Sequence, residues 1–334
     1  MRYPKFLNKN LNLIAPSFGC TTEPYLSRLE MAIKHFNENK INVLEGINIR
    51  NSIGYRSNTC QLCAKEFLDA YKDNNFIMSV GGGNLMNEIL DYIDFDEIKK
   101  LEPTYFMGYS DNTNLTFTLT TICDVASVYG YNAPEFGAKN LEESMIDQIE
   151  FIKGNKLKFS GNTKFELNPI KSESNPYLGY NLDTDSNIIV KNYEKPFSGR
   201  LIGGCIDILQ FLIGTKYDKV REFNERYKND GVIWYLESCD LEAWNTKLVL
   251  LQMERAGWFK YLKGFIIGRP YKYYDDFIGL EIHQSYLDIL SKYNVPIILN
   301  ADIGHLKPCI PVINGAIGLV EVKDNNYTIE YFLE

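Results

Sequence analysis

Basic residues are few and scattered in this sequence. The 35 Lys and Arg residues stand against 43 Asp and Glu residues, which gives a net charge of −8, and no basic run is longer than a pair. Nucleic acids and anionic membranes both require a basic surface, so neither is expected as a partner. No stretch approaches the ~20 apolar residues of a membrane span. Residues 1–10 show no apolar core of a secretory signal, and we predict a cytoplasmic protein.

Histidine is rare and the cysteines are dispersed. The sequence has three histidines and seven cysteines, and Cys60 and Cys63 form the one closely spaced cysteine pair. A structural zinc site needs two further ligands at similar spacing, and a second such pair is missing. A disulfide framework is also unexpected in a chain of this size without a secretory signal. We therefore predict neither a metal site nor structural disulfides.

The composition is that of a globular protein with a large core. The chain has 334 residues, of which 45% are hydrophobic and 23% charged, enough for one large or two medium domains. In the first half, short apolar runs alternate with segments of helical periodicity. This order predicts a parallel sheet covered by helices on both faces. The expected strands are 11–15, 41–44, 76–80 and 105–107, and the expected helices are 26–36, 63–71, 85–93 and 115–122.

A change of composition separates the two halves. Residues 158–198 are rich in Asn, Ser, Gly and Pro and predict a domain junction with long loops and short strands at 164–167 and 188–190. We therefore expect an N-terminal domain at 1–160, junction loops at 161–198 and a C-terminal domain at 199–334. In the C-terminal domain, the patterns predict strands 232–236, 265–267 and 295–299 and helices 206–212, 247–256 and 282–290. They also predict a terminal hairpin of 316–322 with 327–333.

Two turns of the first half each follow a strand and open a helix. In Ser79–Asn84, consecutive glycines let backbone N–H groups approach a ligand or an oxyanion. In Gly108–Asp111, Ser110 is held on a tight turn beside helix N-terminal amides, which favour developing negative charge. Both turns leave the carboxyl ends of parallel strands, where open α/β sheets bind ligands. The structural alternatives are a helix cap at Ser110 and a simple strand-to-helix turn at the glycines.

A nucleophilic serine needs a base and an acid that orients the base. His305 stands in a loop after the apolar strand 295–299 and is the best candidate base among the three histidines. Glu237 ends the apolar strand 232–236, where a partly desolvated carboxylate needs a partner. Bonded to a histidine, it would set the tautomer of the ring. The alternatives are a structural loop histidine and a glutamate paired with an arginine or a helix N-terminus.

An ordered set of motifs along nearly the whole chain resembles the LD-carboxypeptidase family of serine peptidases. The resemblance implies a Ser–Glu–His triad at Ser110, Glu237 and His305, and an oxyanion hole from the N–H groups of Gly82 and Asp111. It also implies a flavodoxin-like N-terminal domain with a parallel sheet, a β-rich, swivelling and barrel-like α/β C-terminal domain, a homodimer, and no cofactor. The motifs are Ile14-Ala15-Pro16-Ser17, Gly81-Gly82, Gly108-Tyr109-Ser110-Asp111, Gly203-Gly204-Cys205, Gly214-Thr215, Leu236-Glu237, Lys263–Gly268 and Gly304-His305 with Pro308.

The glycine turn is similar to that of the microcin C self-immunity branch of this family. The muropeptide branch carries Arg-Gly-Gly-Tyr-Gly there, whereas this turn begins with Val80 and contains no Arg. The immunity branch hydrolyses an amide-type bond between an aspartyl group and a modified adenylate. The resemblance therefore implies a small peptidyl or aspartyl adenylate as substrate, with stacking of the base on an aromatic ring. The implied substrate-binding residues are Gly81, Gly83, Asn84, Tyr177 and Tyr180.

Three other functions stay open. A muropeptide LD-carboxypeptidase would act in murein recycling with the same triad. An α/β-hydrolase esterase shares the Ser–acid–His order, although Gly108–Asn112 departs from the G-x-S-x-G pattern. A non-catalytic protein could instead bind a small anionic ligand at the glycine turn.

Overall fold

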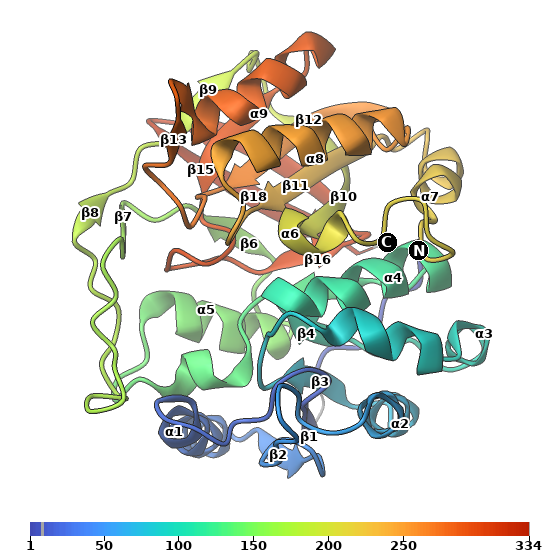
Figure 1. The fold of residues 1–334 in the computed structure, drawn as a ribbon, viewed down its shortest axis with the longest axis vertical. Coiled ribbons are helices and arrows are strands. Elements are labelled where there is room, and N and C mark those ends of the chain that lie inside the picture. Colours follow the sequence, from blue (N-terminus) through green and yellow to red (C-terminus); the bar gives the residue numbers. More distant parts are fainter. Residues whose placement is uncertain (8–9, 334) are drawn as a thin grey trace.

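Two β-sheets lie one above the other and divide the chain into an N-terminal and a C-terminal domain (Figure 1). The computed structural model describes residues 1–7 and 10–333. Within these residues, every helix is too short or too polar to cross a membrane. The N-terminal sheet has six strands, in the spatial order β16 (Val312–Asn314), β5 (Ser127–Tyr129), β4 (Phe106–Gly108), β3 (Phe76–Ser79), β1 (Asn10–Ile14) and β2 (Asn42–Glu45).

The N-terminal sheet is parallel from β2 to β5, and only β16 runs antiparallel to its neighbour. The order β2-β1-β3-β4-β5 is that of flavodoxin-like domains, which confirms the expected fold. Alternate strand residues face opposite sides, so Met78 packs beneath one helical layer and Ile77 beneath the other. The layers contain α1 (Tyr25–Glu38), η3 (Ala133–Gly137) and α5 (Glu143–Ile152) on one face, and α2 (Cys60–Lys72), η1 (Met86–Tyr92), α3 (Phe95–Ile98) and α4 (Thr113–Cys123) on the other.

The C-terminal sheet is mixed. Its four central strands are parallel to one another, and the strands outside them pair antiparallel. The predicted terminal hairpin is confirmed as the β17–β18 pair. The order is β6 (Lys158–Ser160), β18 (Asn326–Phe332), β17 (Ile317–Lys323), β10 (Phe197–Cys205), β11 (Val232–Glu237), β12 (Leu262–Gly268), β15 (Ile297–Ala301) and β9 (Ile189–Lys191), with helices α6 (Ile206–Leu209), α7 (Val220–Arg226), α8 (Ala243–Arg255), α9 (Ile282–Leu290) and η4 (Ser291–Tyr293).

The two domains exchange strands and share a helix. β16 joins the N-terminal sheet although it follows the C-terminal core strands, while β6 and β9 join the C-terminal sheet. Helix α4 contacts β4 below it and β10 and α6 above it, so the turn before α4, which contains Ser110, faces the domain interface. The junction, with β7 (Lys164–Phe165) and β8 (Thr184–Asp185), runs along the left of Figure 1 past both domains.

Some elements differ from the sequence-based prediction. The helix expected at 85–93 is the 3₁₀ helix η1, and β7 is shorter than the strand expected at 164–167. Strand β10 was not predicted, because its glycines Gly199, Gly203 and Gly204 interrupt the apolar alternation. The short hairpin β13 (Asp276–Phe277) and β14 (Leu280–Glu281) was not predicted either.

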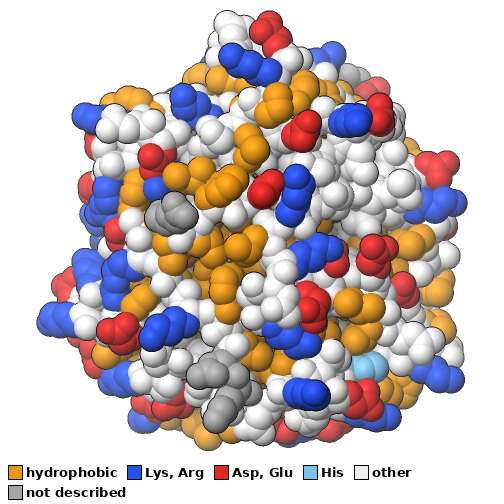
Figure 2. Space-filling view, turned by 180° about the vertical axis from the view of Figure 1, so that it is seen from behind, with side chains coloured by type: hydrophobic (Ala, Val, Ile, Leu, Met, Phe, Trp, Pro, Cys, Tyr) orange, Lys and Arg blue, Asp and Glu red, His pale blue; other side chains and the backbone are white. Residues whose placement is uncertain are grey.

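Charged side chains of both signs are interspersed over the face shown in Figure 2, around an apolar area near its centre. This distribution agrees with the absence of basic runs in the sequence.

Candidate active site

Ser110 stands on the turn between β4 and α4. β4 ends at Gly108, and the 3₁₀ turn η2 (Ser110–Asn112) leads directly into α4. Ser110 has φ +64°, a left-handed conformation that residues other than glycine adopt infrequently. Its backbone N–H donates to the Tyr129 hydroxyl at 3.0 Å. The turn therefore holds the serine hydroxyl above the carboxyl end of the sheet.

The structure brings Ser110, His305 and Glu237 into one hydrogen-bonded chain. His305 Nε2 lies 3.0 Å from Ser110 Oγ, and His305 Nδ1 lies 2.9 Å from Glu237 Oε2. Because the carboxylate can only accept, Nδ1–H donates to it and Nε2 is left to accept the serine proton. The three side chains come from the turn after β4, the end of β11 and the loop after β15. This geometry is that of a nucleophile, a base and an orienting acid.

The Glu237 carboxylate is completely buried but has two donors. His305 bonds to Oε2 and the Tyr129 hydroxyl bonds to Oε1. Burial alone would raise the pKa of Glu237, yet the charge and hydrogen bond of His305, together with Tyr129, hold it below its ordinary value. The acid is therefore ionised at neutral pH and able to stabilise an imidazolium.

The loop that carries His305 is held on several sides. Gly304, with φ +109°, lies against the acid, and a Cβ there would stand 2.6 Å from Glu237 Oε2. Asp302 forms a fully buried ion pair with Arg269. Lys307 donates to the Gly304 carbonyl at 3.2 Å. Because these contacts involve residues on both sides of His305 in the chain, they restrain the loop and keep the imidazole ring beside Glu237.

The glycine turn lies directly against Ser110. A Cβ at Gly82 would stand 3.2 Å from Ser110 Cβ and 3.4 Å from its Oγ. The Asn112 side chain ties the two turns together, because its amide donates to the Gly81 carbonyl at 2.9 Å. Within residues 1–7 and 10–333, the N–H groups of Gly82 and Asp111 have no protein acceptor. Both amides are thus available to an oxyanion.

The Asp111 side chain points away from the substrate side. Its buried carboxylate accepts hydrogen bonds from Ser17 Oγ at 2.7 Å, the Met86 N–H at 2.9 Å and the Asn114 side chain at 3.0 Å. Burial raises the pKa of Asp111 above its ordinary value, against these hydrogen bonds. The carboxylate therefore links the Ser110 turn to the loop after β1 and to the start of η1.

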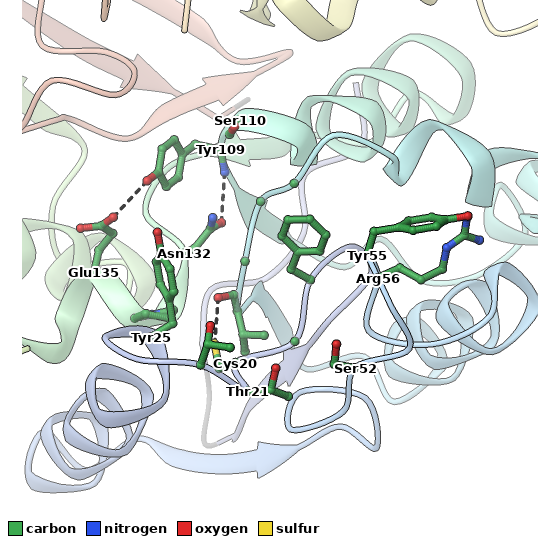
Figure 3. A pocket seen from close by; sticks show the side chains of 18 of the residues that line it. Cys20, Thr21, Tyr25, Ser52, Tyr55, Arg56, Tyr109, Ser110, Asn132 and Glu135 are labelled. Atoms are coloured by element: carbon green, nitrogen blue, oxygen red, sulfur yellow. Dashed lines mark hydrogen bonds between the residues drawn. The ribbon is translucent and has the colours of Figure 1, made fainter. Parts of the chain in front are cut away.

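Ser110 and His305 line a cavity of about 520 Å³. Figure 3 shows this cavity with Ser110 at its edge. Its walls include the loops after β1 and β3, the two strands at which the sheet order reverses, where flavodoxin-like sheets bind ligands. The segments after β2, β4, β5 and β15 complete the lining. Tyr55 and Arg56 lie on one side of the cavity, and Tyr25 and Glu135 on the other. Arg56 forms an ion pair with Glu88, and its guanidinium covers the Tyr55 ring at 4.7 Å.

The residues that the resemblance implies for substrate binding fall into two groups. Gly81 and Gly83 line the cavity, together with Gly82. Among the described residues, Asn84, Tyr177 and Tyr180 are not part of the lining of this cavity. The Tyr180 ring packs against Tyr131, with 6.4 Å between ring centroids, while Tyr177 is 40% exposed.

Several residues at the site were missed in the sequence. Tyr25, Tyr55, Arg56 and Glu135 line the cavity, and Tyr129 contacts Ser110 and Glu237. Tyr55 and Arg56 stand in an irregular loop between β2 and α2, where no periodic pattern marks them.

Cys60 and Cys63 lie in the first turns of α2 as free thiols. The Cys60 thiol contacts Arg56, and the Cys63 thiol lies 3.2 Å from Ser57 Oγ. In the part of the chain that the structure describes, no group of three or more His, Cys, Asp or Glu side chains is placed to hold a metal ion.

Comparison with known families agrees with this architecture. The model of the LD-carboxypeptidase N-terminal domain matches residues 11–130, and that of the LD-carboxypeptidase C-terminal domain matches residues 198–319. The fold and these matches define a two-domain α/β serine hydrolase. The chain belongs to the LD-carboxypeptidase family.

Similar proteins extend over nearly the whole chain. A Vibrio cholerae protein named as a carboxypeptidase is 22% identical over 311 residues, 91% of this chain and 90% of that protein. The microcin C7 self-immunity protein MccF of Escherichia coli is 24% identical over 288 residues, 82% of this chain and 80% of MccF. A solved structure of MccF with aspartyl sulfamoyl adenosine has a TM-score of 0.80 at 19% identity and covers 99% of this chain and 98% of that one. The MccF-like protein of Bacillus anthracis has a TM-score of 0.79 at 22% identity, with 99% and 100% covered.

Proposed function

We propose that this protein is a serine peptidase or amidase that cleaves an amide-type bond through an acyl-enzyme. The observation that supports this most is the hydrogen-bonded chain from Ser110 through His305 to Glu237, with distances of 3.0 Å and 2.9 Å. It opens into a cavity large enough for a small-molecule substrate, since such sites usually measure about 300–1,000 Å³.

In the proposed reaction, His305 takes the Ser110 hydroxyl proton as Oγ attacks the substrate carbonyl carbon. The tetrahedral oxyanion is bound by the N–H groups of Gly82 and Asp111, and each such donor is typically worth about 3 kcal/mol. The bond to the leaving group then breaks, and His305 passes its proton to that group. Water attacks the acyl-enzyme with His305 again as base, which releases the acid and restores Ser110. Glu237 stays ionised and stabilises the imidazolium.

For the substrate we propose a peptidyl or aspartyl adenylate type of molecule. MccF, which shares the fold, has been solved with aspartyl sulfamoyl adenosine. The cavity offers the aromatic rings of Tyr25 and Tyr55 for a planar base, and Arg56 is the single Lys or Arg among its described lining residues. Tyr25, Tyr55 and Arg56 line the same cavity as Ser110, whereas Tyr177 and Tyr180 lie outside its lining.

One observation favours a second candidate, a muropeptide LD-carboxypeptidase. The Arg56 guanidinium, which is paired with Glu88, lines the cavity, and a guanidinium also suits the free carboxylate at the end of a peptide. The glycine turn lacks the arginine of that branch, which makes this candidate the weaker one.

The deciding experiment offers aspartyl sulfamoyl adenosine and a muropeptide tetrapeptide separately to the pure protein and identifies the products by mass. We expect the adenylate to be preferred at least about tenfold in kcat/KM, or ~1.4 kcal/mol. The Ser110→Ala variant is the control for each substrate. Equal or better cleavage of the muropeptide would assign the protein to the second candidate, and no cleavage of either by the wild type would reject both.

A further inference from the structure

Tyr129 joins two parts of the candidate site that come from different domains. It ends β5 of the N-terminal sheet and is buried beneath Ser110 and Glu237. Its hydroxyl oxygen lies 3.0 Å from the Ser110 backbone nitrogen and is also hydrogen-bonded to Glu237 Oε1. A single phenol thus contacts the nucleophile's backbone and the acid.

The chemistry of the three groups determines the direction of both hydrogen bonds. A backbone N–H can only donate, so Tyr129 Oη accepts from Ser110. An ionised carboxylate can only accept, so the single phenolic hydrogen is donated to Glu237. Burial and the nearby Glu237 charge raise the pKa of Tyr129 well above its ordinary value, so the phenol keeps this hydrogen. The order is Ser110 N–H to Tyr129 O–H to Glu237.

We propose that Tyr129 is a positioning residue of the hydrolytic reaction, which holds the Ser110 backbone in its left-handed conformation and restrains the free oxygen of Glu237. The inference rests on the proposed function. Tyr129 does not touch the substrate side and acts through the two residues that it bonds.

Each hydrogen bond has a separate consequence for the reaction. The bond from Ser110 N–H satisfies a partly buried donor on a residue at φ +64° and so supports this conformation. The bond to Oε1 leaves Oε2 directed at His305 and spreads part of the carboxylate charge onto the phenol. Removing the phenolic hydroxyl therefore frees the carboxylate to rotate and concentrates its charge on the histidine side.

Other ionisable groups around Glu237 do not replace this contact. They lie in β10, α6, β11, α9 and the loops that follow β11 and β15, and they are Cys205, Asp207, Tyr235, Cys239, Tyr286 and Cys309. Among the described residues, Tyr129 and His305 are the strong donors to the Glu237 carboxylate, and the Cys205 thiol, a weak donor, lies beside it.

The test replaces Tyr129 by Phe, which removes the hydroxyl and keeps the ring. We expect kcat to fall at least about tenfold, or ~1.4 kcal/mol, with KM unchanged within about twofold. Because the carboxylate loses a donor, it holds the imidazolium more strongly. The acidic limb of the pH profile of kcat/KM should then move to higher pH by about half a unit.

Tyr235→Phe is the matched control. Tyr235 is equally buried, its ring centroid lies 5.7 Å from that of Tyr129, and its hydroxyl has no hydrogen-bond partner in the described part of the chain. We expect this variant to keep the wild-type kcat and pH profile. If the two variants lose activity equally, with the acidic limb unmoved in both, Tyr129 is only a packing residue and the proposal is overturned.

A second variant keeps the test decisive if Tyr129→Phe does not fold. A 3-fluorotyrosine at position 129 adds one small atom and makes the phenol a stronger donor. It should withdraw charge from Glu237 and move the acidic limb to lower pH, opposite to the effect of Phe. An unchanged limb or a shift to higher pH would contradict the proposal.

The same assay distinguishes failure of the proposed hydrolytic function from failure of the inference about Tyr129. Wild-type protein that hydrolyses neither probe substrate overturns the proposed function and this inference together. Wild-type hydrolysis that Ser110→Ala abolishes and Tyr129→Phe leaves unaltered overturns the inference alone.

Discussion

The inner and outer parts of the cavity are built differently. At the inner end, Ser110 and His305 are held by buried partners, with Glu237 and Asp111 completely covered behind them. At the outer end, Tyr25 and Tyr55 are 55% and 59% exposed. Buried, hydrogen-bonded groups are preorganised for charge development, whereas exposed side chains can adjust to a ligand. We therefore expect inner substitutions to lower kcat and outer substitutions to change KM.

The largest effect is expected at the inner end, for Ser110→Ala. The hydroxyl has no substitute as nucleophile, so kcat should fall by at least about 10³-fold while the thermal unfolding midpoint stays near that of the wild type. Steady-state hydrolysis and circular dichroism measure the two quantities. Retention of more than about a tenth of the wild-type kcat would remove Ser110 from the nucleophile role.

The acid and the base should behave as one unit. Glu237→Gln keeps the size of the side chain but removes the charge that stabilises the imidazolium, and we expect kcat to fall about 10²- to 10⁴-fold. Adding His305→Ala to this variant should cost far less than the product of the two separate losses, as a double-mutant cycle of kcat/KM will show. Losses that multiply independently would contradict a single triad.

An intermediate effect is expected at the glycine turn. Gly82→Ala puts a methyl group 3.2 Å from Ser110 Cβ, in a backbone conformation that alanine tolerates. The crowding should displace the oxyanion donors and lower kcat about 10- to 100-fold with little change in unfolding midpoint. Full activity of this variant would show that the oxyanion does not bind beside Gly82.

A smaller effect, on KM rather than on kcat, is expected at the outer end of the cavity. Arg56→Ala should raise KM about tenfold and leave kcat within about twofold, because the guanidinium would bind substrate and transition state equally. Arg50→Ala is the control, since Arg50 also forms surface ion pairs, with Glu30 and Glu45, but lies outside the cavity lining. A fall in kcat without a change in KM would remove the distinction between the two ends.

The smallest effect concerns stability rather than catalysis. Burial opposes ionisation of Glu135, but the charges of Lys171, Lys307 and Arg28 hold its pKa well below the ordinary value. A carboxyl group whose pKa is lower in the folded state than in the unfolded state stabilises the fold at pH values above its unfolded-state pKa of about 4.3. This stabilisation is lost as the pH falls toward the folded-state pKa. The difference in unfolding midpoint between wild type and Glu135→Gln should therefore be larger at pH 6 than at pH 3. A constant difference would show that the Glu135 charge does not stabilise the fold.

Local patterns determined much of the fold. The alternation of apolar strands and amphipathic helices predicted the parallel N-terminal sheet, and period-two alternation predicted the β17–β18 hairpin. Strand β10 could not be predicted in this way, because its glycines pack against Thr113 and the Tyr235 backbone, contacts that no local pattern reports. Helix α7 and strand β16 were missed as well.

The sequence by itself identified Ser110, Glu237 and His305 as candidates, since each follows a recognisable strand and carries reactive chemistry. That these three side chains meet was decided by tertiary structure, because Ser110 and His305 are separated by 195 positions and join only where the two domains pack together. The same packing placed Tyr129 against Glu237, 108 positions away, and opened the cavity toward Tyr55 and Arg56. Short-range periodicity reports which face of an element is buried, but contacts between distant residues depend on strand order and domain packing.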